Sequence, residues 1–354
     1  MSSILVTGGA GFIGSNFLHY WCLRHPHDKL VALDALTYAG NLSSIQTLLG
    51  NENVTFVKGS IGNQPLVEQL FREHNFDTVV NFAAESHVDR SITGPDAFID
   101  TNIIGTHTLL KACRKAWLDN NNLENHRFHH ISTDEVFGSL QPEDPPFNES
   151  NQYLPNSPYS ASKASSDHLV RAYHHTYGLK VTTSNCSNNY GPYHYPEKLI
   201  PLCITNILNG KSLPIYGDGK NIRDWLFVED HCRGIELILD KGKPGATYNI
   251  GGNNEWDNIS LVNLICDVID ELFASDKQLR TRFPTCPSSM NNECRQLIKY
   301  VPDRAGHDWR YAISTEKIAK ELNYKSKTTF EDGIRKTVQW YLDNQAWWEP
   351  LISQ

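Results

Sequence analysis

The sequence predicts an α/β fold in which a doubly wound parallel sheet is followed by a smaller mixed α/β unit. Through the first half of the chain, apolar strand-like runs alternate with amphipathic stretches, which is typical of βαβ units. After about Tyr190 the alternation ends, and prolines and glycines become frequent. A length of 354 residues is also sufficient for two packed units. We therefore expect residues 1–190 to form the first unit and residues 191–354 to form mainly the second.

The alternating pattern places the elements of the first unit in order. Strands are expected at Ser3–Thr7, Lys29–Asp34, Val54–Lys58, Thr78–Phe82, Phe128–Ser132 and Val181–Asn185. Helices are expected at Ile13–Leu23, Pro65–His74, Asp100–Trp117 and Ser160–Tyr177. Gly245–Gly252 reads as one more strand and a turn, so a segment near residues 221–252 is expected to return to the main sheet.

Composition excludes several classes of protein. Hydrophobic residues make up 40% and charged residues 20% of the chain, and no window approaches the roughly 18 apolar residues of a membrane span. The first residues resemble no signal peptide, so we expect a cytoplasmic protein. The eight cysteines are scattered without a CxxC pair, which predicts free thiols and no metal site. A net charge of −8 disfavours a nucleic-acid surface, so an anionic ligand would need a local set of basic side chains.

A glycine loop near the N-terminus predicts a dinucleotide site. Gly8, Gly11 and Gly14 form a GxxGxxG pattern between an expected strand and an expected helix. Such glycines permit a tight turn, a close backbone approach to a pyrophosphate and tight packing of helix on strand, as in a Rossmann-type fold. Asp34 ends the next expected strand, where an acid can accept hydrogen bonds from the adenosine ribose and repel a 2′-phosphate. The predicted cofactor is NAD.

Tyr159 and Lys163 are four residues apart at the start of an expected helix, so they share one face. A nearby cation favours the phenolate, and we expect Lys163 to lower the pKa of Tyr159 so that the phenol can accept a hydroxyl proton. Tyr216 and Lys220 repeat this spacing, but the glycines between them predict a loop, so we discard that pair.

Together these features resemble the extended short-chain dehydrogenase/reductase superfamily. Further motifs resemble the signatures of its dTDP-glucose 4,6-dehydratase family, and the likeness runs from Ile4 to about Tyr341. These motifs are Thr133-Asp134-Glu135-Val136-Phe137-Gly138, Asn188-Asn189-Tyr190-Gly191-Pro192, Pro196-Glu197-Lys198-Leu199-Ile200-Pro201, Ile222-Arg223-Asp224-Trp225 and Asp303-Arg304-Ala305-Gly306-His307-Asp308. The Asp-Glu pair after Thr133 is the most informative, since epimerase relatives usually have small or hydroxyl residues there.

The resemblance implies a dehydration that proceeds through a transient oxidation of the sugar. Tyr159 would deprotonate the sugar's 4-hydroxyl as hydride leaves C4 for NAD, and Thr133 would hydrogen-bond near the 4-oxygen. The 4-keto group acidifies the C5 proton, which Glu135 would remove, while a protonated Asp134 donates to the departing 6-hydroxyl. Hydride return to C6 and protonation at C5 would leave a 4-keto-6-deoxy sugar. Adjacent carboxyls suit these roles because like charges push their pKa values apart.

The resemblance also implies the binding residues. The cofactor would be bound by Gly8, Gly11, Phe12, Ile13, Gly14, Asp34, Ala35, Leu36, Thr37, Ser60, Ile61, Ala83, Ala84, Glu85, Thr101, Tyr159, Lys163 and Asn189. The substrate would be bound by Ser86, Thr133, Asn188, Lys198, Leu199, Pro214, Ile215, Tyr216, Arg223, Asn258, Arg304 and His307. Two positions depart from the family pattern: Ser60 replaces an Asp that would contact the adenine amine, and Ala305 replaces a proline.

Several alternatives stay open at this stage. A sugar-nucleotide 4-epimerase would share the glycine loop and the Tyr159/Lys163 pair but would need no acids at positions 134 and 135. A catalytically silent NAD-binding sensor would give no reason for these groups to occur together. The nucleotide could carry uridine or cytidine in place of thymidine. By analogy with the superfamily, the helices Asp100–Trp117 and Ser160–Tyr177 are expected to form a homodimer interface.

Overall fold

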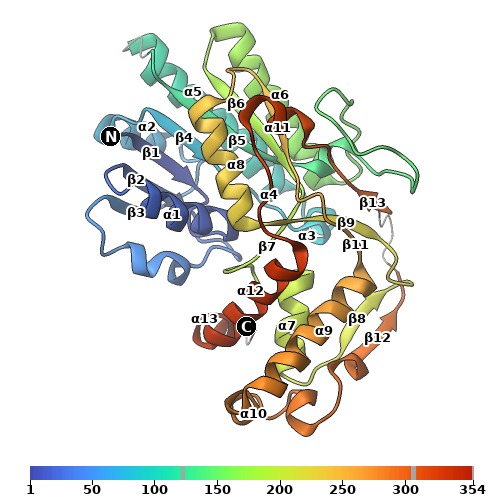
Figure 1. Ribbon diagram of the computed structural model, residues 1–354. Helices are drawn as coiled ribbons and strands as arrows, with labels where there is room; N and C mark the ends of the chain where they lie inside the picture. Colours follow the sequence, from blue (N-terminus) through green and yellow to red (C-terminus); the bar gives the residue numbers. More distant parts are fainter. Residues whose placement is uncertain (121–123, 304–307, 353–354) are drawn as a thin grey trace.

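The computed structural model describes residues 1–120, 124–303 and 308–352 (Figure 1). Its centre is a seven-stranded parallel sheet in the order β10-β6-β5-β4-β1-β2-β3. The strands are β1 (Ser3–Thr7), β2 (Lys29–Asp34), β3 (Val54–Lys58), β4 (Thr78–Asn81), β5 (Arg127–Thr133), β6 (Val181–Cys186) and β10 (Thr247–Ile250). The predicted α/β fold with a doubly wound parallel sheet is confirmed, and the strand expected within Gly245–Gly252 lies at the edge of the sheet beside β6.

Helices cover both faces of this sheet because each buries one apolar stripe against it. Helices α1 (Phe12–Arg24), α8 (Val228–Lys241) and α11 (Glu316–Leu322) pack on one face around a core that includes Phe17 and Ile235. Helices α2 (Gln64–His74), α5 (Thr106–Arg114) and α6 (Pro158–Tyr177) pack on the other around Val67, Leu109 and Val170. Between β2 and β3 lies the 3₁₀ segment Leu42–Leu48.

The helix expected at Asp100–Trp117 is longer and less regular than its pattern predicts. The chain is helical from α4 (Asp96–Phe98) through α5, but the flanking segments Ile99–Gly105 and Lys115–Asn120 are π-helical. A π turn adds a residue to the helical repeat, which a search for the 3.6-residue period does not detect. Before it lies the short helix α3 (Val88–Thr93).

Helix α6, which begins at Pro158, has sequence signals at both ends. The Ser157 hydroxyl accepts a hydrogen bond from the Ser160 N–H, and the Ser160 hydroxyl accepts one from the Ser157 N–H, which forms a capping box. The helix ends at Gly178, whose φ of +76° is the left-handed conformation that glycine adopts without strain. The position of Tyr159 in the first turn is therefore fixed by local sequence.

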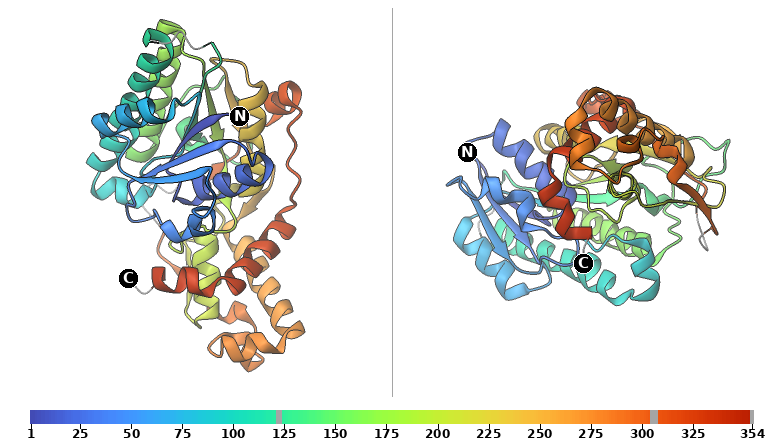
Figure 2. Two further views of the ribbon diagram at one scale, coloured as in Figure 1. Left: turned by 90° about the vertical axis from the view of Figure 1, so that its left-hand side faces the viewer. Right: turned by 90° about the horizontal axis from the view of Figure 1, so that it is seen from below.

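The second unit lies at one end of the sheet, below it in Figure 1 and in the left-hand view of Figure 2. Its helices are α7 (Leu199–Leu208), α9 (Asn258–Ser275), α10 (Lys277–Arg282), α12 (Phe330–Asp343) and α13 (Gln345–Ile352), with 3₁₀ turns at Pro287–Met290 and Cys294–Leu297. Its strands β7 (Asn188–Tyr190), β9 (Ile222–Phe227), β11 (Glu255–Asp257) and β13 (Arg310–Tyr311) form one small sheet, and β8 (Leu213–Tyr216) pairs with β12 (Ile298–Val301).

The two units are connected by side-chain contacts as well as by the segments of chain that run between them. The second unit has its own core, which includes Ile204, Ile265 and Tyr341. Trp347 of α13 contacts the first unit, where it donates its indole N–H to the Ser44 hydroxyl over 3.2 Å. In the described ranges, no helix combines the length and apolarity needed to cross a lipid bilayer.

Candidate active site

A cavity of about 830 Å³ opens at the carboxyl ends of the central strands. Strands β1 and β4 are neighbours there, and the sheet continues through β2 on one side and through β5 on the other, which is the usual binding position in such folds. All residues assigned above to catalysis, cofactor or substrate line this one cavity, apart from Leu36, Arg304 and His307. Arg304 and His307, together with Ala305, lie outside the described residues.

The glycine loop brings its backbone to the cavity wall. Gly8 has a φ of +67°, and a Cβ on Gly14 would lie 2.1 Å from the Gly8 carbonyl oxygen, so a side chain at position 14 would clash with backbone. The N-cap of α1 is Gly11, and no side chain caps this helix end. Its backbone N–H groups and partial positive charge are therefore suited to an anion.

Asp34 closes the loop from the next strand. Its carboxylate accepts hydrogen bonds from the N–H groups of Ala10 over 2.9 Å and Leu36 over 2.8 Å. Burial raises the pKa of Asp34, and these N–H groups oppose that rise. Leu36 thus supports Asp34 through its backbone, with a φ of +52°, and is not part of the cavity wall.

The end of β5 delivers three polar residues to the cavity. Thr133 caps the 3₁₀ turn Asp134–Phe137, and its hydroxyl accepts from the Glu135 N–H over 3.3 Å and lies 3.3 Å from Asp134 Oδ1. Asp134 is 2% exposed, and its Oδ2 is buried without a hydrogen-bond partner. Burial, followed by the nearby Glu135 and Asp224 carboxylates, raises the pKa of Asp134 well above its usual value. The site therefore favours a neutral acid at position 134 beside a second carboxyl.

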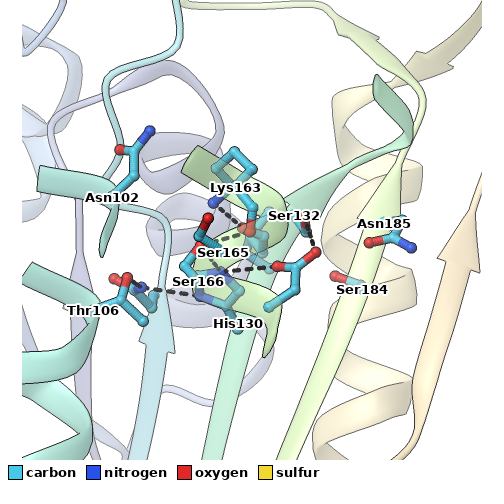
Figure 3. Close-up of polar contacts among 12 residues, drawn as sticks. Asn102, Thr106, His130, Ser132, Lys163, Ser165, Ser166, Ser184 and Asn185 are labelled. Carbon is cyan, nitrogen blue, oxygen red and sulfur yellow. Dashed lines mark hydrogen bonds and ion pairs between the residues drawn. The ribbon is translucent and has the colours of Figure 1, made fainter. Parts of the chain in front are cut away.

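Tyr159 meets these acids from the start of α6. The carboxyl groups of Glu135 and Asp134 both act on the titration of its phenol, and Tyr159 is 8% exposed. The expected lowering of its pKa by Lys163 is wrong for this structure: burial, then Glu135, raises the pKa of Tyr159 well above 10. The physical reason is that burial disfavours the phenolate more than any neighbouring group favours it. The Lys163 ammonium donates to the Ile131 carbonyl on β5 over 2.7 Å (Figure 3).

The second unit contributes polar groups to the opposite wall. Arg223 on β9 donates to the carbonyls of Ile222 over 2.7 Å and Asp308 over 3.0 Å, and its guanidinium lies 4.7 Å from the centre of the Tyr311 ring. Asn258, at the start of α9, has a buried Oδ1 without a hydrogen-bond partner. Arg223 and Lys198 supply the local basic groups that an anionic ligand would need in a chain of net charge −8.

A cluster at the cavity wall was missed in the sequence. The Arg90 guanidinium lies 3.7 Å from the centre of the Tyr38 ring, and Glu197 accepts ion-pair contacts from His87 over 3.6 Å and Arg90 over 3.8 Å. Tyr38, His87 and Glu197 line the cavity, as do Cys186, Ser187, Tyr195 and Tyr311. The one available signal was Glu197, which directly precedes Lys198 in the quoted motif, whereas the others come together only through folding.

The fold and the site define this protein as an extended short-chain dehydrogenase/reductase. Residues 5–337 match the family model described as GDP-mannose 4,6 dehydratase. The chain is 55% identical over its whole length to a dTDP-glucose 4,6-dehydratase of Xanthomonas campestris pv. campestris (strain B100), of which it covers 97%. It is 52% identical over 99% of its length to dTDP-glucose 4,6-dehydratase 1 of Escherichia coli (strain K12), of which it covers 95%.

Solved structures agree with these relatives. The chain superposes with a TM-score of 0.85 on a Bacillus anthracis dTDP-glucose 4,6-dehydratase in complex with NAD, at 46% identity over 99% of this chain and 100% of that one. A UDP-glucose 4-epimerase of Thermotoga maritima shares the fold with a TM-score of 0.81 but only 26% identity, over 97% of this chain and 99% of that one. The chain belongs to the dTDP-glucose 4,6-dehydratase family.

Proposed function

We propose that this protein is a hydro-lyase that removes water from dTDP-glucose and yields dTDP-4-keto-6-deoxyglucose, with NAD as a tightly bound cofactor. The observation that carries the proposal is the meeting of Tyr159, Asp134 and Glu135 in one cavity beside the glycine loop. A 4-epimerase needs a base for the 4-hydroxyl but has no use for two adjacent carboxyls at the end of β5.

The residues of the glycine loop fit NAD. The close approach of Gly14 to Gly8 and the uncapped start of α1 suit a pyrophosphate, and the buried Asp34 carboxylate suits an adenosine ribose without a 2′-phosphate. When bound, NAD supplies reversible hydride acceptance, which permits oxidation at C4 and reduction at C6, and its oxidised ring adds a positive charge. The chain's own residues perform the proton chemistry.

Each of the three catalytic side chains has a distinct proton task in this proposal. Tyr159 removes the proton of the sugar 4-hydroxyl, while Thr133 holds the same oxygen by a hydrogen bond. Glu135 takes the C5 proton and later returns a proton to C5. Asp134, kept neutral by burial and by its neighbours, protonates the departing 6-hydroxyl.

The nucleoside diphosphate belongs to the opposite wall. We assign Lys198, Leu199, Pro214, Ile215, Tyr216, Arg223 and Asn258 to it, with Arg304 and His307 from the segment outside the described residues. The guanidinium and ammonium groups suit phosphate oxygens. In this division, residues 1–190 hold NAD, and residues 191–354 hold mainly the nucleotide sugar.

Product analysis tests the proposed reaction. Purified protein with dTDP-glucose should form a 4-keto sugar that absorbs in alkali, and parallel assays with UDP-glucose and CDP-glucose should give lower kcat/KM values. If dTDP-galactose is recovered instead, the protein is an epimerase and the proposal is wrong. If UDP- or CDP-glucose gives the highest kcat/KM, the dehydration stands and the choice of base is wrong.

Asp34→Ala should weaken NAD binding and reduce discrimination against NADP, because the carboxylate that repels a 2′-phosphate is lost. The measurement is the Kd of each cofactor for the variant and the wild type. Asp28→Asn, which changes a carboxyl on the loop before β2 away from the cavity, is the matched control. An unchanged ratio of the two Kd values in Asp34→Ala would show that the Asp34 carboxylate does not contact the adenosine ribose.

We also propose a cytoplasmic homodimer that pairs through α5 and α6. Free cysteines suit a reducing compartment. Apolar side chains stay exposed in this region, with Ile99 at 43%, Ile104 at 51% and Tyr177 at 42% exposure. Sedimentation should give the mass of two chains, and Ile104→Asp should shift it toward one chain. A single-chain mass for the wild type would contradict the dimer.

A further inference from the structure

A buried polar cluster lies directly behind the catalytic groups, between β5 and α6 (Figure 3). Its members are His130 and Ser132 on β5 and Lys163, Ser166 and Asp167 on α6, and all are nearly or fully buried. Residues two apart on a strand share a face, so His130 and Ser132 both point to α6. The proton chemistry proposed above gives no step to any of these five residues, although Ser132 and Lys163 line the cavity.

Asp167 is the hub of this cluster. Its Oδ2 accepts a hydrogen bond from the Ser132 hydroxyl over 2.7 Å, and its Oδ1 lies 3.3 Å from His130 Nε2. Ser132 immediately precedes Thr133, and Asp167 follows Lys163 by one helical turn. The carboxylate therefore joins the strand end that carries the acids to the helix that carries Tyr159 and Lys163.

His130 is neutral and cannot be the partner that balances the charge of Asp167. Its Nδ1 lies 3.1 Å from Asn81 Nδ2, a donor, so Nδ1 accepts and the ring proton is on Nε2, toward Ser166 and Asp167. Burial and the charge of Lys163 lower the pKa of His130 to about 4.

Lys163 carries the buried positive charge that the Asp167 carboxylate stabilises. Burial lowers the pKa of Lys163, whereas Asp167 and Cys186 raise it. Burial also raises the pKa of the Cys186 thiol to about 12, so the thiol is neutral near neutral pH. Of these two groups, only the Asp167 carboxylate then carries a charge that opposes the desolvation of the ammonium.

We propose that Asp167 is a positioning residue of the reaction, whose carboxylate keeps the buried Lys163 ammonium charged and, through Ser132, fixes the end of β5 against α6. The proposal rests on the proposed function and adds to it a role for Lys163, whose buried ammonium lies one helical turn from Tyr159 and, while charged, favours loss of the phenol proton. Asp167 acts through Lys163 and Ser132 and does not line the cavity.

Several other titratable groups face this pair. Lys163 is faced by His130 on β5 and by Cys186 on β6, and Asp167 is faced by His130 and by Tyr153 from the loop before α6. Tyr159 lies one helical turn before Lys163 on α6. Burial raises the pKa values of Tyr153, Tyr159 and Cys186 and lowers that of His130. Each of these groups is therefore neutral around pH 7, so none of them adds a charge next to Lys163.

The pH dependence of kcat for Asp167→Asn tests the proposal, with NAD and dTDP-glucose saturating. A charged Lys163 is required, so the rate falls as pH rises through the pKa of Lys163. Loss of the neighbouring negative charge lowers that pKa, and we expect the alkaline limb to move about 1–3 pH units toward neutral, with activity recovered at lower pH. Asp167→Ser makes the same charge change with a smaller side chain if the Asn variant does not fold.

Two further variants separate charge from structure. Ser132→Ala removes the hydrogen bond but keeps the charge, and Asp167→Glu keeps the charge in a longer side chain. Both should keep the wild-type alkaline limb even if kcat falls. Equal loss of kcat at every pH in Asp167→Asn, with the limb unmoved, would overturn the charge role. An inactive wild type would instead refute the proposed function, so the two failures are distinguishable.

Discussion

Tyr159→Phe should lower kcat for dTDP-glucose by about 10²–10⁴-fold, while the fold and the bound NAD are retained. The substitution removes one hydroxyl from a ring that packs edge-on against Phe98, with the ring centres 6.3 Å apart, so packing changes little. Without the phenol, no other group of this helix turn is available to take the 4-hydroxyl proton. Steady-state assays and a thermal melt together measure the effect.

Tyr173→Phe is the matched control for this substitution. Tyr173 lies on the same helix, and its hydroxyl contacts His107 over 3.4 Å outside the cavity. Its kcat should stay close to that of the wild type. If Tyr159→Phe also retains wild-type kcat, the phenol is not the base, and a role as a silent NAD-binding protein becomes the better account.

Asp134→Asn should slow water loss by about 10²–10⁴-fold but slow the first oxidation much less, so reduced nicotinamide should accumulate on the enzyme. An amide has nearly the shape of the acid but cannot give a proton to the departing 6-hydroxyl. The measurement is reduced-nicotinamide absorbance in a single turnover. Equal slowing of both steps would remove Asp134 from the acid role.

Glu135→Gln is the matched comparison, because it changes the other carboxyl in the same way. It should also stop the reaction after oxidation, but at the removal of the C5 proton. In deuterated water, the sugar bound to Asp134→Asn should therefore exchange its C5 hydrogen, whereas the sugar bound to Glu135→Gln should not. The opposite pattern would exchange the roles of the two residues.

Local sequence patterns predict the framework of the first unit well, because strand and helix signals are short-range. β1, β2 and β3 have the bounds expected from their apolar runs, and α6 ends at Tyr177 as expected but begins at Pro158, two residues before the expected start. The π-helical turns around α5 were not predicted, since they depend on packing. There Asn102 is buried and donates to the Ser162 hydroxyl over 2.8 Å.

The electrostatics of the site could not be predicted from spacing. A four-residue interval places Tyr159 and Lys163 on one face, but it does not show that both are buried, nor that Lys163 donates to Ile131. The neutral state expected for Asp134 agrees with its burial, whereas the expected acidity of Tyr159 does not. The contacts of Asp167 on α6 with Ser132 and His130 on β5 join elements that are far apart in sequence, so local patterns could not predict them.

The most direct test of the central claim is conversion of dTDP-glucose in deuterated water, followed by location of the label in the product. Tyr159, Glu135 and Asp134 must act on one sugar in this reaction, so a 4-keto-6-deoxy product should carry solvent deuterium at C5. A product without deuterium at C5, or dTDP-galactose without any label, would contradict it.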